Sequence, residues 1–227
     1  MNNKRCYKQF CGLAKAMDII GERWTLLILR DLILGPWRYS DLLERMQGMT
    51  TNLLARRLKE LEEHGLIIKR EQSSLGSTHV YELTELGKEL EPAMLALSRF
   101  GFNFMQSGPE PDEQVDPGRA LLNLKSRFLD RKTTHKVTPG VVTFSFKEQD
   151  SQNRRQVYQV EFNSAGVEIR HGENRLIEVC VGLSLATYAD MVFRNADASK
   201  LEKKGQLTIT GDRKIWNNFA SVFSLKK

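Results

Sequence analysis

Between residues 50 and 65 the hydrophobic positions recur with the spacing of an α-helix. They form one apolar face, which consists of Leu54, Leu58 and Leu61. A hydroxyl at Thr50 or Thr51 can cap the helix N-terminus, and Gly65 is the residue type that most easily ends a helix. The pattern therefore predicts an amphipathic helix with one face docked into a core.

The other face of this predicted helix carries polar and cationic side chains, namely Asn52, Arg56 and Lys59. Basic residues, among them Arg57, occupy the first half of the helix, and three glutamates crowd the second half. A helix that enters DNA with its N-terminus first needs this polarity, because its dipole and its arginines then meet phosphates and bases. An ordinary amphipathic helix with a solvated face shows the same pattern, so this stretch alone leaves both interpretations open.

The elements predicted around this helix favour a DNA-binding fold. Residues 37–43 predict a turn and a short helix with Ser40 as its cap, and residues 66–70 predict a strand. A polar stretch and a second strand at 79–83 then complete a β-hairpin. Helix, turn, helix and hairpin, in this order, are the elements of a winged helix-turn-helix.

Residues 11 to about 102 resemble the HxlR-type branch of the MarR-like winged-helix regulators. The matching segments are Cys11, residues 20–25 (IGERWT), 28–32 (ILRDL), 35–36 (GP), 38–39 (RY), 54–66, 81–84 (YELT) and Gly87. The resemblance implies a dimeric, cytoplasmic, bacterial-type transcription regulator. The family's usual proline before the returning wing strand is replaced by Ser77–Thr78, which leaves the path of the wing open.

Further helices are predicted on both sides of the recognition helix. Residues 13–20 form one helix, and residues 23 to about 34 form a second that is apolar on most sides and should be buried. After the wing, Thr84 caps a helix whose pattern Pro92 interrupts. The segment from 94 to 105 is strongly apolar. In the resembling family the first and last helices form the dimer, but this segment could instead pack on the chain's own second domain.

A boundary rich in proline, glycine and acidic residues follows at residues 107–118 (SGPEPDEQVDPG). We predict a winged-helix domain at 1–107, a linker at 108–118 and a second domain at 119–227. In the second domain, alternating apolar residues predict strands, and residues 120–129, 184–195 and the C-terminal segment predict helices. The predicted fold class is α+β: a mostly helical winged helix-turn-helix domain, then an antiparallel sheet backed by helices.

Residues 141 to about 225 resemble the sterol carrier protein type 2-like domain. The resemblance rests on a strand pair, the helix at 185–192 (LATYADMV), the strand at 205–212 (GQLTITGD) and an amphipathic last helix. It implies an apolar tunnel that holds a lipid or another hydrophobic small molecule. Candidate lining residues are Phe144, Phe162, Met191 and Phe219. Such side chains also fill ordinary cores, so both interpretations stay open.

Cys11 lies where the HxlR-type family places its cysteine, and some relatives use such a cysteine to sense oxidants or electrophiles. Its neighbours Lys8 and Lys15 would favour a thiolate. The alternative is a small, buried and inert residue at a helix start. The three cysteines of the chain show neither zinc-site spacing nor a disulfide framework.

Composition permits a nucleic-acid partner without requiring one. The 227 residues are 41% hydrophobic and 27% charged, with a net charge of +6. The net charge is +2 for residues 1–107 and +4 for residues 108–227, so the excess is not concentrated in the predicted DNA-binding domain. The sequence has no apolar run of membrane-spanning length and no hydrophobic secretory core, which favours the cytoplasm and no membrane partner.

The sequence also contains no phosphate-binding glycine loop, metal-ligand cluster or nucleophile motif. We therefore expect neither an enzyme nor a resident cofactor or metal. The predicted function is a homodimeric, sequence-specific transcription regulator that binds double-stranded DNA. We expect a repressor that binds a palindromic operator and responds to a hydrophobic ligand. The alternative is a lipid-binding or protein-interaction module whose winged helix does not read DNA.

In the regulator hypothesis, Arg38, Arg57 and the backbone near Ser40 and Thr50 hold phosphates, and Thr51, Asn52 and Arg56 reach base edges. The candidate DNA-binding residues are Arg38, Tyr39, Ser40, Thr50, Thr51, Asn52, Arg56, Arg57, Lys59, Ser77, Thr78 and His79.

Overall fold

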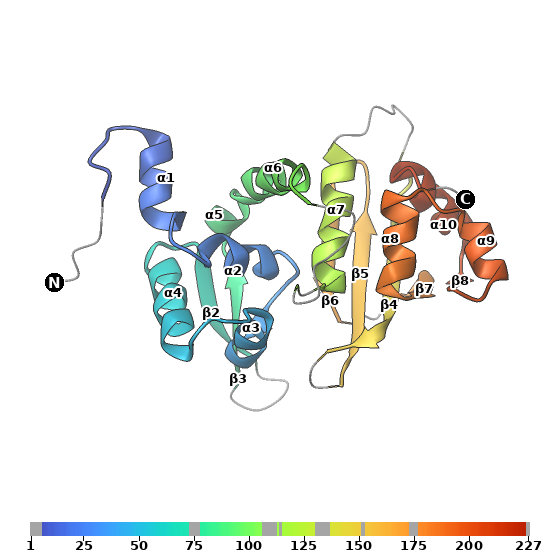
Figure 1. Ribbon diagram of the computed structural model, residues 1–227, viewed down its shortest axis with the longest axis horizontal. Helices are drawn as coiled ribbons and strands as arrows, with labels where there is room; N and C mark the ends of the chain where they lie inside the picture. Colours follow the sequence, from blue (N-terminus) through green and yellow to red (C-terminus); the bar gives the residue numbers. More distant parts are fainter. Residues whose placement is uncertain are drawn as a thin grey trace. The chain divides into compact units, whose positions relative to one another are not determined.

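The computed structural model of the protein describes residues 6–72, 78–105, 113, 115–129, 137–150, 153–172 and 177–225. The chain divides into two compact units, Met1–Met94 and Leu95–Lys227 (Figure 1). Helix α6 runs across the division between them. Each unit is described in turn.

The first unit combines helices with a small sheet. Its helices are α1 (Gly12–Ile20), α2 (Thr25–Leu32), α3 (Tyr39–Arg45), α4 (Thr51–Glu63), α5 (Glu85–Lys88) and the start of α6 (Glu91–Phe102). Its strands are β1 (Trp37–Arg38), β2 (Ile67–Gln72) and β3 (Thr78–Leu83), in the order β1-β3-β2. Helices α3 and α4 followed by the β2–β3 hairpin confirm the predicted winged helix-turn-helix.

The apolar faces predicted from the helical pattern are buried. Leu54, Leu58 and Leu61 of α4 are at most 2% exposed, and Ile28 and Leu29 place α2 at the centre of the unit, as predicted. Helix α4 ends at His64, and Gly65 follows in the left-handed conformation, with φ of +69°. Local spacing and end signals were therefore sufficient to define α4.

Two local predictions around α3 are wrong. Ser40 does not cap the helix, because the N-cap is Arg38 and Ser40 already lies in the first turn. Trp37 and Arg38 form strand β1, which pairs antiparallel with Tyr81 and Val80 of β3, where we expected a turn. A two-residue strand carries no periodicity, so its existence depends on a partner more than forty positions away. The tip of the predicted wing, including Ser77, lies outside the described residues.

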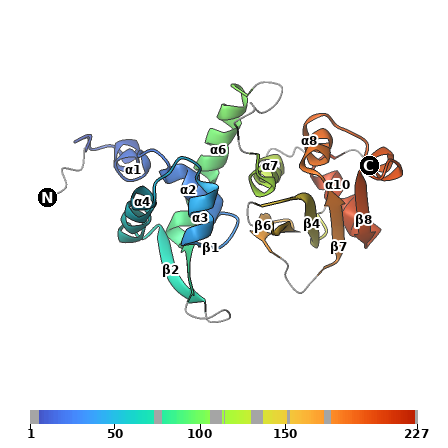
Figure 2. The same cartoon turned by 60° about the horizontal axis from the view of Figure 1, so that its bottom comes forward.

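The second unit contains a five-stranded sheet and helices. Its strands are β4 (Gly140–Gln149), β5 (Arg155–Phe162), β6 (Val167–His171), β7 (Val179–Leu183) and β8 (Leu207–Gly211). Its helices are α7 (Pro117–Leu129), α8 (Leu185–Phe193), α9 (Ala198–Lys203) and α10 (Arg213–Val222). Figure 2 shows α7, α8 and α10 on one side of this sheet. The α+β class is confirmed, and α7 already includes residues 117 and 118 of the predicted linker.

The sheet is mixed, whereas we predicted an antiparallel one. The strand order is β6-β5-β4-β7-β8, and β7 pairs parallel with β4, with Phe144 opposite Val181. The other pairings are antiparallel. Alternation of apolar residues reports the two faces of a strand but carries no information on the direction of its neighbour, so the pattern could not distinguish the two arrangements. Helix α9, capped by Asp197, was also not predicted.

Helix α6 has two kinds of apolar side chain at its C-terminal end. Phe102 lies 6.1 Å from Phe193 of α8, measured between ring centroids, so this ring packs within the second unit. By contrast, Leu97, Phe100 and Phe104 are exposed. Packing on the chain's own second domain therefore applies to Phe102. The exposed side chains remain available for a dimer contact, which stays a prediction. None of the described helices is long and apolar enough to cross a membrane.

Candidate nucleic-acid interface

The N-terminus of α4 is fixed by two hydrogen bonds. The Thr50 hydroxyl accepts a hydrogen bond from the Leu53 amide at 3.3 Å, which caps the helix. The Tyr39 hydroxyl donates to the backbone oxygen of Thr51 at 2.7 Å. This second bond joins the first residue of α3 to the first turn of α4, so it restrains the two helices of the motif relative to each other.

The predicted base-reading residues lie on the exposed side of α4. Thr51, Asn52 and Arg56 are all exposed. Among the described residues, Arg56 has no ion-pair partner, and the same holds for Arg38, which is half-buried at the N-cap of α3. Lys59 lies 3.8 Å from Glu63, a loose contact between two exposed side chains. The charges of Arg38 and Arg56 are therefore available to a ligand.

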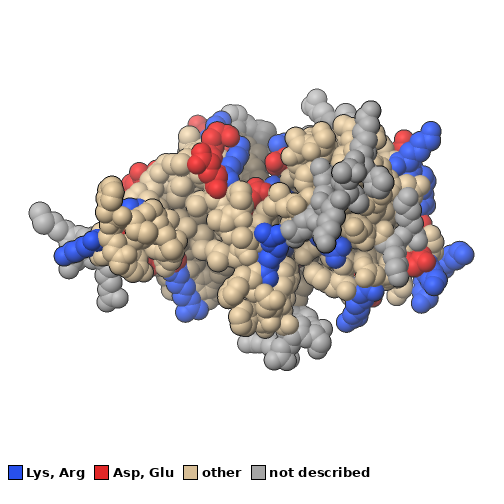
Figure 3. Space-filling model, turned by 90° about the horizontal axis from the view of Figure 1, so that it is seen from above, with Lys and Arg blue, Asp and Glu red and all other residues tan. Residues whose placement is uncertain are grey.

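Other candidates contribute less clearly to this surface. Ser40 is exposed at the start of α3, and Tyr39 is half-buried by its bond to α4. In the wing, Thr78 is half-buried and His79 is exposed on β3 opposite Glu71. On the face shown in Figure 3, basic side chains are spread over both units. Bulk charge does not mark the interface, so individual side chains must define it.

Arg57 does not lie on the exposed face, which corrects its assignment as a phosphate contact. Its side chain is 7% exposed, and its Nη1 and Nη2 atoms each lie 2.5 Å from a carboxylate oxygen, of Glu60 and Glu22 respectively. A guanidinium enclosed in this way cannot also reach DNA. The sequence carried a signal for this position, since Arg57 stands three residues after Leu54 and four before Leu61, beside the apolar face.

A buried ionic network that sequence reasoning missed supports α3. The fully buried Asp31 carboxylate of α2 accepts hydrogen bonds from the Nε atoms of Arg30 and Arg45, each at 3.0 Å. The Arg45 guanidinium stacks 4.4 Å from the Trp37 ring, and the Trp37 indole donates to the Asp31 backbone oxygen at 2.9 Å. The network ties α3 to α2 and β1. An aspartate in a helix that is apolar on most sides was the available signal.

The N-terminal cysteines are exposed, so the buried alternative for Cys11 is wrong. Cys11 is the N-cap of α1 without a side-chain capping bond, but the backbone amides of Ala14 and Leu13 make the largest contributions that lower the pKa of its thiol. The helix start, more than the neighbouring lysines, therefore favours the thiolate. The Cys6 thiol donates to Asp18 at 3.1 Å and lowers the pKa of that carboxyl.

The four candidate ligand-lining residues are buried together in the second unit. Phe144, Phe162, Met191 and Phe219 are at most 1% exposed. The Phe219 ring lies 5.7 Å from Phe144 and 5.4 Å from Phe162, between centroids. These distances are typical of packed aromatic pairs. Among the described residues, no cluster of three His, Cys, Asp or Glu side chains is arranged to hold a metal ion.

Two family models match this chain in the order of its two units. The HxlR-like helix-turn-helix model matches residues 19–109, and the SCP-2 sterol transfer model matches residues 124–224. An uncharacterized HTH-type transcriptional regulator of Mycobacterium tuberculosis is 31% identical over 138 residues, which cover 57% of this chain and 87% of that relative. The chain belongs to the HxlR-like helix-turn-helix family. This confirms the resemblance inferred from the sequence.

A second relative of this HxlR-like protein is the HTH-type transcriptional regulator YodB of Bacillus subtilis. It is 29% identical over 108 residues, which cover 48% of this chain and 93% of YodB. The solved structure of reduced YodB covers 44% of this chain and 100% of its own, with 27% identity and a TM-score of 0.39. The HxlR-like protein is therefore a DNA-binding transcription regulator that carries an SCP-2-like second domain.

Proposed function

We propose that this HxlR-like protein is a sequence-specific repressor that binds a palindromic operator as a homodimer in the cytoplasm. The observation that carries the proposal is the polarity of α4. Asn52 and Arg56 are exposed in its first half, Arg56 has no ion-pair partner among the described residues, and Leu54, Leu58 and Leu61 are buried. This arrangement suits a helix that enters the major groove with its N-terminus leading, because the positive end of the helix then faces the DNA.

The proposed contacts divide into two classes. Arg38 and the backbone amides near Ser40 and Thr50 hold phosphates, which position the protein without reading sequence. Asn52 reads adenine and Arg56 reads guanine, since each presents donors that match the edge of that base. Thr51 adds a hydroxyl at the same groove, and the wing residues Thr78 and His79 touch the adjacent backbone.

Exposed apolar side chains support the homodimer. Leu13 on α1 is 72% exposed, and Phe100 and Phe104 on α6 are 63% and 72% exposed. Large apolar side chains that are exposed to this degree favour a protein partner, and closed two-fold symmetry is the commonest arrangement of identical chains. A dimer would hold two recognition helices over half-sites about one DNA turn apart.

We further propose that residues 119–227 form a ligand domain, joined through a linker at 108–118 to the winged-helix domain at 1–107. The SCP-2 match supports a hydrophobic ligand. Because the Phe219 ring packs against both Phe144 and Phe162, a ligand between these rings must separate them. Control of DNA binding then requires that the ligand bind more tightly to one of the two DNA-binding states.

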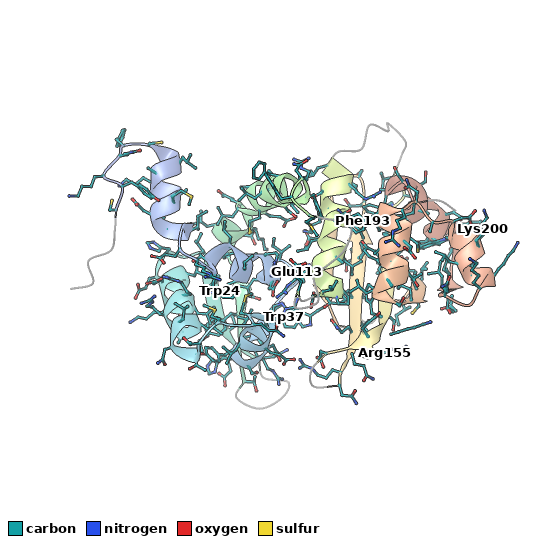
Figure 4. All side chains as sticks on the ribbon, in the orientation of Figure 1. Trp24, Trp37, Glu113, Arg155, Phe193 and Lys200 are labelled. Carbon is teal, nitrogen blue, oxygen red and sulfur yellow. The ribbon has the colours of Figure 1, made fainter. Side chains whose placement is uncertain are left out.

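The test is selection from a random-sequence duplex pool, with and without a lipid extract, followed by sequencing of the retained DNA. We expect a palindrome, with its enrichment weakened by the extract. In Arg56→Ala, base preference at one position of each half-site should relax at a cost of about 1–3 kcal/mol. The matched control is Arg155→Ala, which removes an exposed guanidinium from β5 of the second unit (Figure 4).

Four outcomes would contradict parts of the proposal. No enrichment at moderate salt would refute the DNA-reading function and leave the lipid-binding or protein-interaction module. If Arg56→Ala kept the same base preference as the control Arg155→Ala, the proposed docking of α4 would be refuted. Equal enrichment of the palindrome with and without the lipid extract would refute control by a hydrophobic ligand. Higher expression of a palindrome-bearing reporter in the presence of the regulator than in its absence would refute the sign of regulation.

A further inference from the structure

Arg57 connects the recognition helix to the corner between α1 and α2. Its Nη2 atom lies 2.5 Å from Glu22, a residue 35 positions earlier in the chain, and its Nη1 atom lies 2.5 Å from Glu60 within α4. The guanidinium is therefore bound at once to its own helix and to a different segment. Of these two contacts, only the one with Glu22 joins α4 to another part of the unit.

The corner that presents Glu22 is conformationally defined. Trp24, labelled in Figure 4, adopts the left-handed region with φ of +80°, an uncommon conformation for a bulky residue. At Gly21 a Cβ atom would lie 2.4 Å from the backbone oxygen of Met17. The Glu22 backbone oxygen accepts a hydrogen bond from the Thr25 amide at 3.1 Å. Glu22 is thus held on a tight turn, which makes it a fixed point for Arg57.

Stability alone does not account for a cation at this position. The Arg57 side chain is 7% exposed, and its Nε atom is buried and has no hydrogen-bond partner among the residues that the structure describes. Burial of a charge with an unsatisfied donor is costly, and an apolar side chain of similar length would fill the space without that cost. The ion pair is better explained by the direction it imposes on α4.

We propose that the Arg57–Glu22 ion pair is a positioning contact that sets the rotation of α4 about its axis, and thereby the bases that Asn52 and Arg56 reach. The proposal rests on the DNA-reading function given above. Successive residues of a helix point about 100° apart, so an inward Arg57 obliges Arg56 to point elsewhere. A rotation of about 20° would move a group about 6 Å from the axis by about 2 Å, more than a functional contact tolerates.

The contact also joins α4 to α1 through a single side chain. Glu22 directly follows α1 and Gly21, and α1 carries the exposed Leu13 that we assign to the dimer surface. Displacement of α1 would move Glu22 and, through Arg57, the recognition helix. The ion pair is therefore a positioning device for specificity, and its loss should affect sequence discrimination more than general DNA affinity.

The test compares Glu22→Gln, Arg57→Met and the double variant with wild type. The readouts are the ratio of affinity for the selected operator to that for a random duplex, the salt dependence of both, and the melting temperature. Glu60→Gln is the matched control, because it removes the same charge and also bonds Arg57 but lies on α4 itself. Glu22 is 60% exposed in its side chain, so Glu22→Gln carries the test even if Arg57→Met fails to fold.

We expect the operator-to-random ratio to fall about tenfold in Glu22→Gln and in Arg57→Met, within the discrimination that one bidentate base contact provides. The double variant should lose no more than either single one, because both remove the same contact. Glu60→Gln should keep the wild-type ratio, and random-duplex affinity and its salt dependence should stay unchanged in every variant.

A wild-type ratio in Glu22→Gln would overturn the positioning role. So would a reduced salt dependence in Arg57→Met, which would make Arg57 a phosphate contact instead. A wild-type protein without operator preference would overturn the proposed function, and the inference with it, so the two failures are distinguishable.

Discussion

Arg38→Ala is expected to weaken binding to every DNA sequence alike. Arg38 is the N-cap of α3, and among the described residues its guanidinium has no ion-pair partner. Its charge is therefore not neutralised within the protein and is available to a phosphate. In the proposed docking it touches the DNA backbone, so its removal should cost affinity without changing base preference.

The magnitude follows from counterion release. Each phosphate contact contributes about −0.9 to the slope of log affinity against log salt on B-form DNA. A dimer loses two contacts when Arg38 is replaced, so the slope should become less negative by about 1.8. Between about 50 and 200 mM salt, the wild type should therefore lose roughly twelvefold more affinity than the variant.

Fluorescence anisotropy with a labelled operator and a labelled random duplex, at four salt concentrations, measures both slopes. Arg155→Ala serves as control, because it removes an exposed arginine of the second unit. An unchanged slope in Arg38→Ala would show that Arg38 touches no phosphate. A change confined to the operator would show that it reads a base.

Three further predictions concern stability and reactivity. Phe219 is fully buried, so Phe219→Ala should lower the free energy of unfolding by about 3–5 kcal/mol in urea denaturation; a loss below about 1 kcal/mol would contradict the packed core. Thr50→Ala should cost about 1 kcal/mol in the same assay and Thr50→Ser much less, since serine keeps the cap. The lowered pKa of the Cys11 thiol leaves more thiolate at neutral pH. In a variant in which Cys6 and Cys180 are replaced, iodoacetamide should therefore react with Cys11 faster than with free cysteine. A rate profile shifted to higher pH would disprove this.

The local part of the fold could be read from the sequence. The leucine spacing of α4, its Thr50 cap and the glycine that follows it are all short-range signals, and the structure places the helix accordingly. The same is true of the buried α2 and of the wing strands β2 and β3. Hydrogen bonds and side-chain spacing within a helix or hairpin involve residues close in the chain, so their pattern is visible there.

The candidate site was predictable only in outline. The periodicity of α4 correctly put Asn52 and Arg56 on its exposed face. The same periodicity puts Arg57 beside the apolar face, but it did not reveal the carboxylate that binds Arg57, because Glu22 comes from a corner 35 residues away. The cause of the lowered pKa of the Cys11 thiol was also not visible in the sequence. We expected neighbouring lysines to lower it, but backbone amides of α1 make the largest contributions.

The sequence by itself determined most of the helices and strands, β1 and α9 excepted, as well as the apolar faces and the two families that the chain resembles. The tertiary structure alone decided the parallel pairing of β4 with β7, the burial of Asp31 between two arginines and the ion pair of Arg57 with Glu22. The physical reason is the range of the interactions. Periodicity is set by neighbours in the chain, whereas the partner of a strand or of a buried charge is chosen by the whole packing.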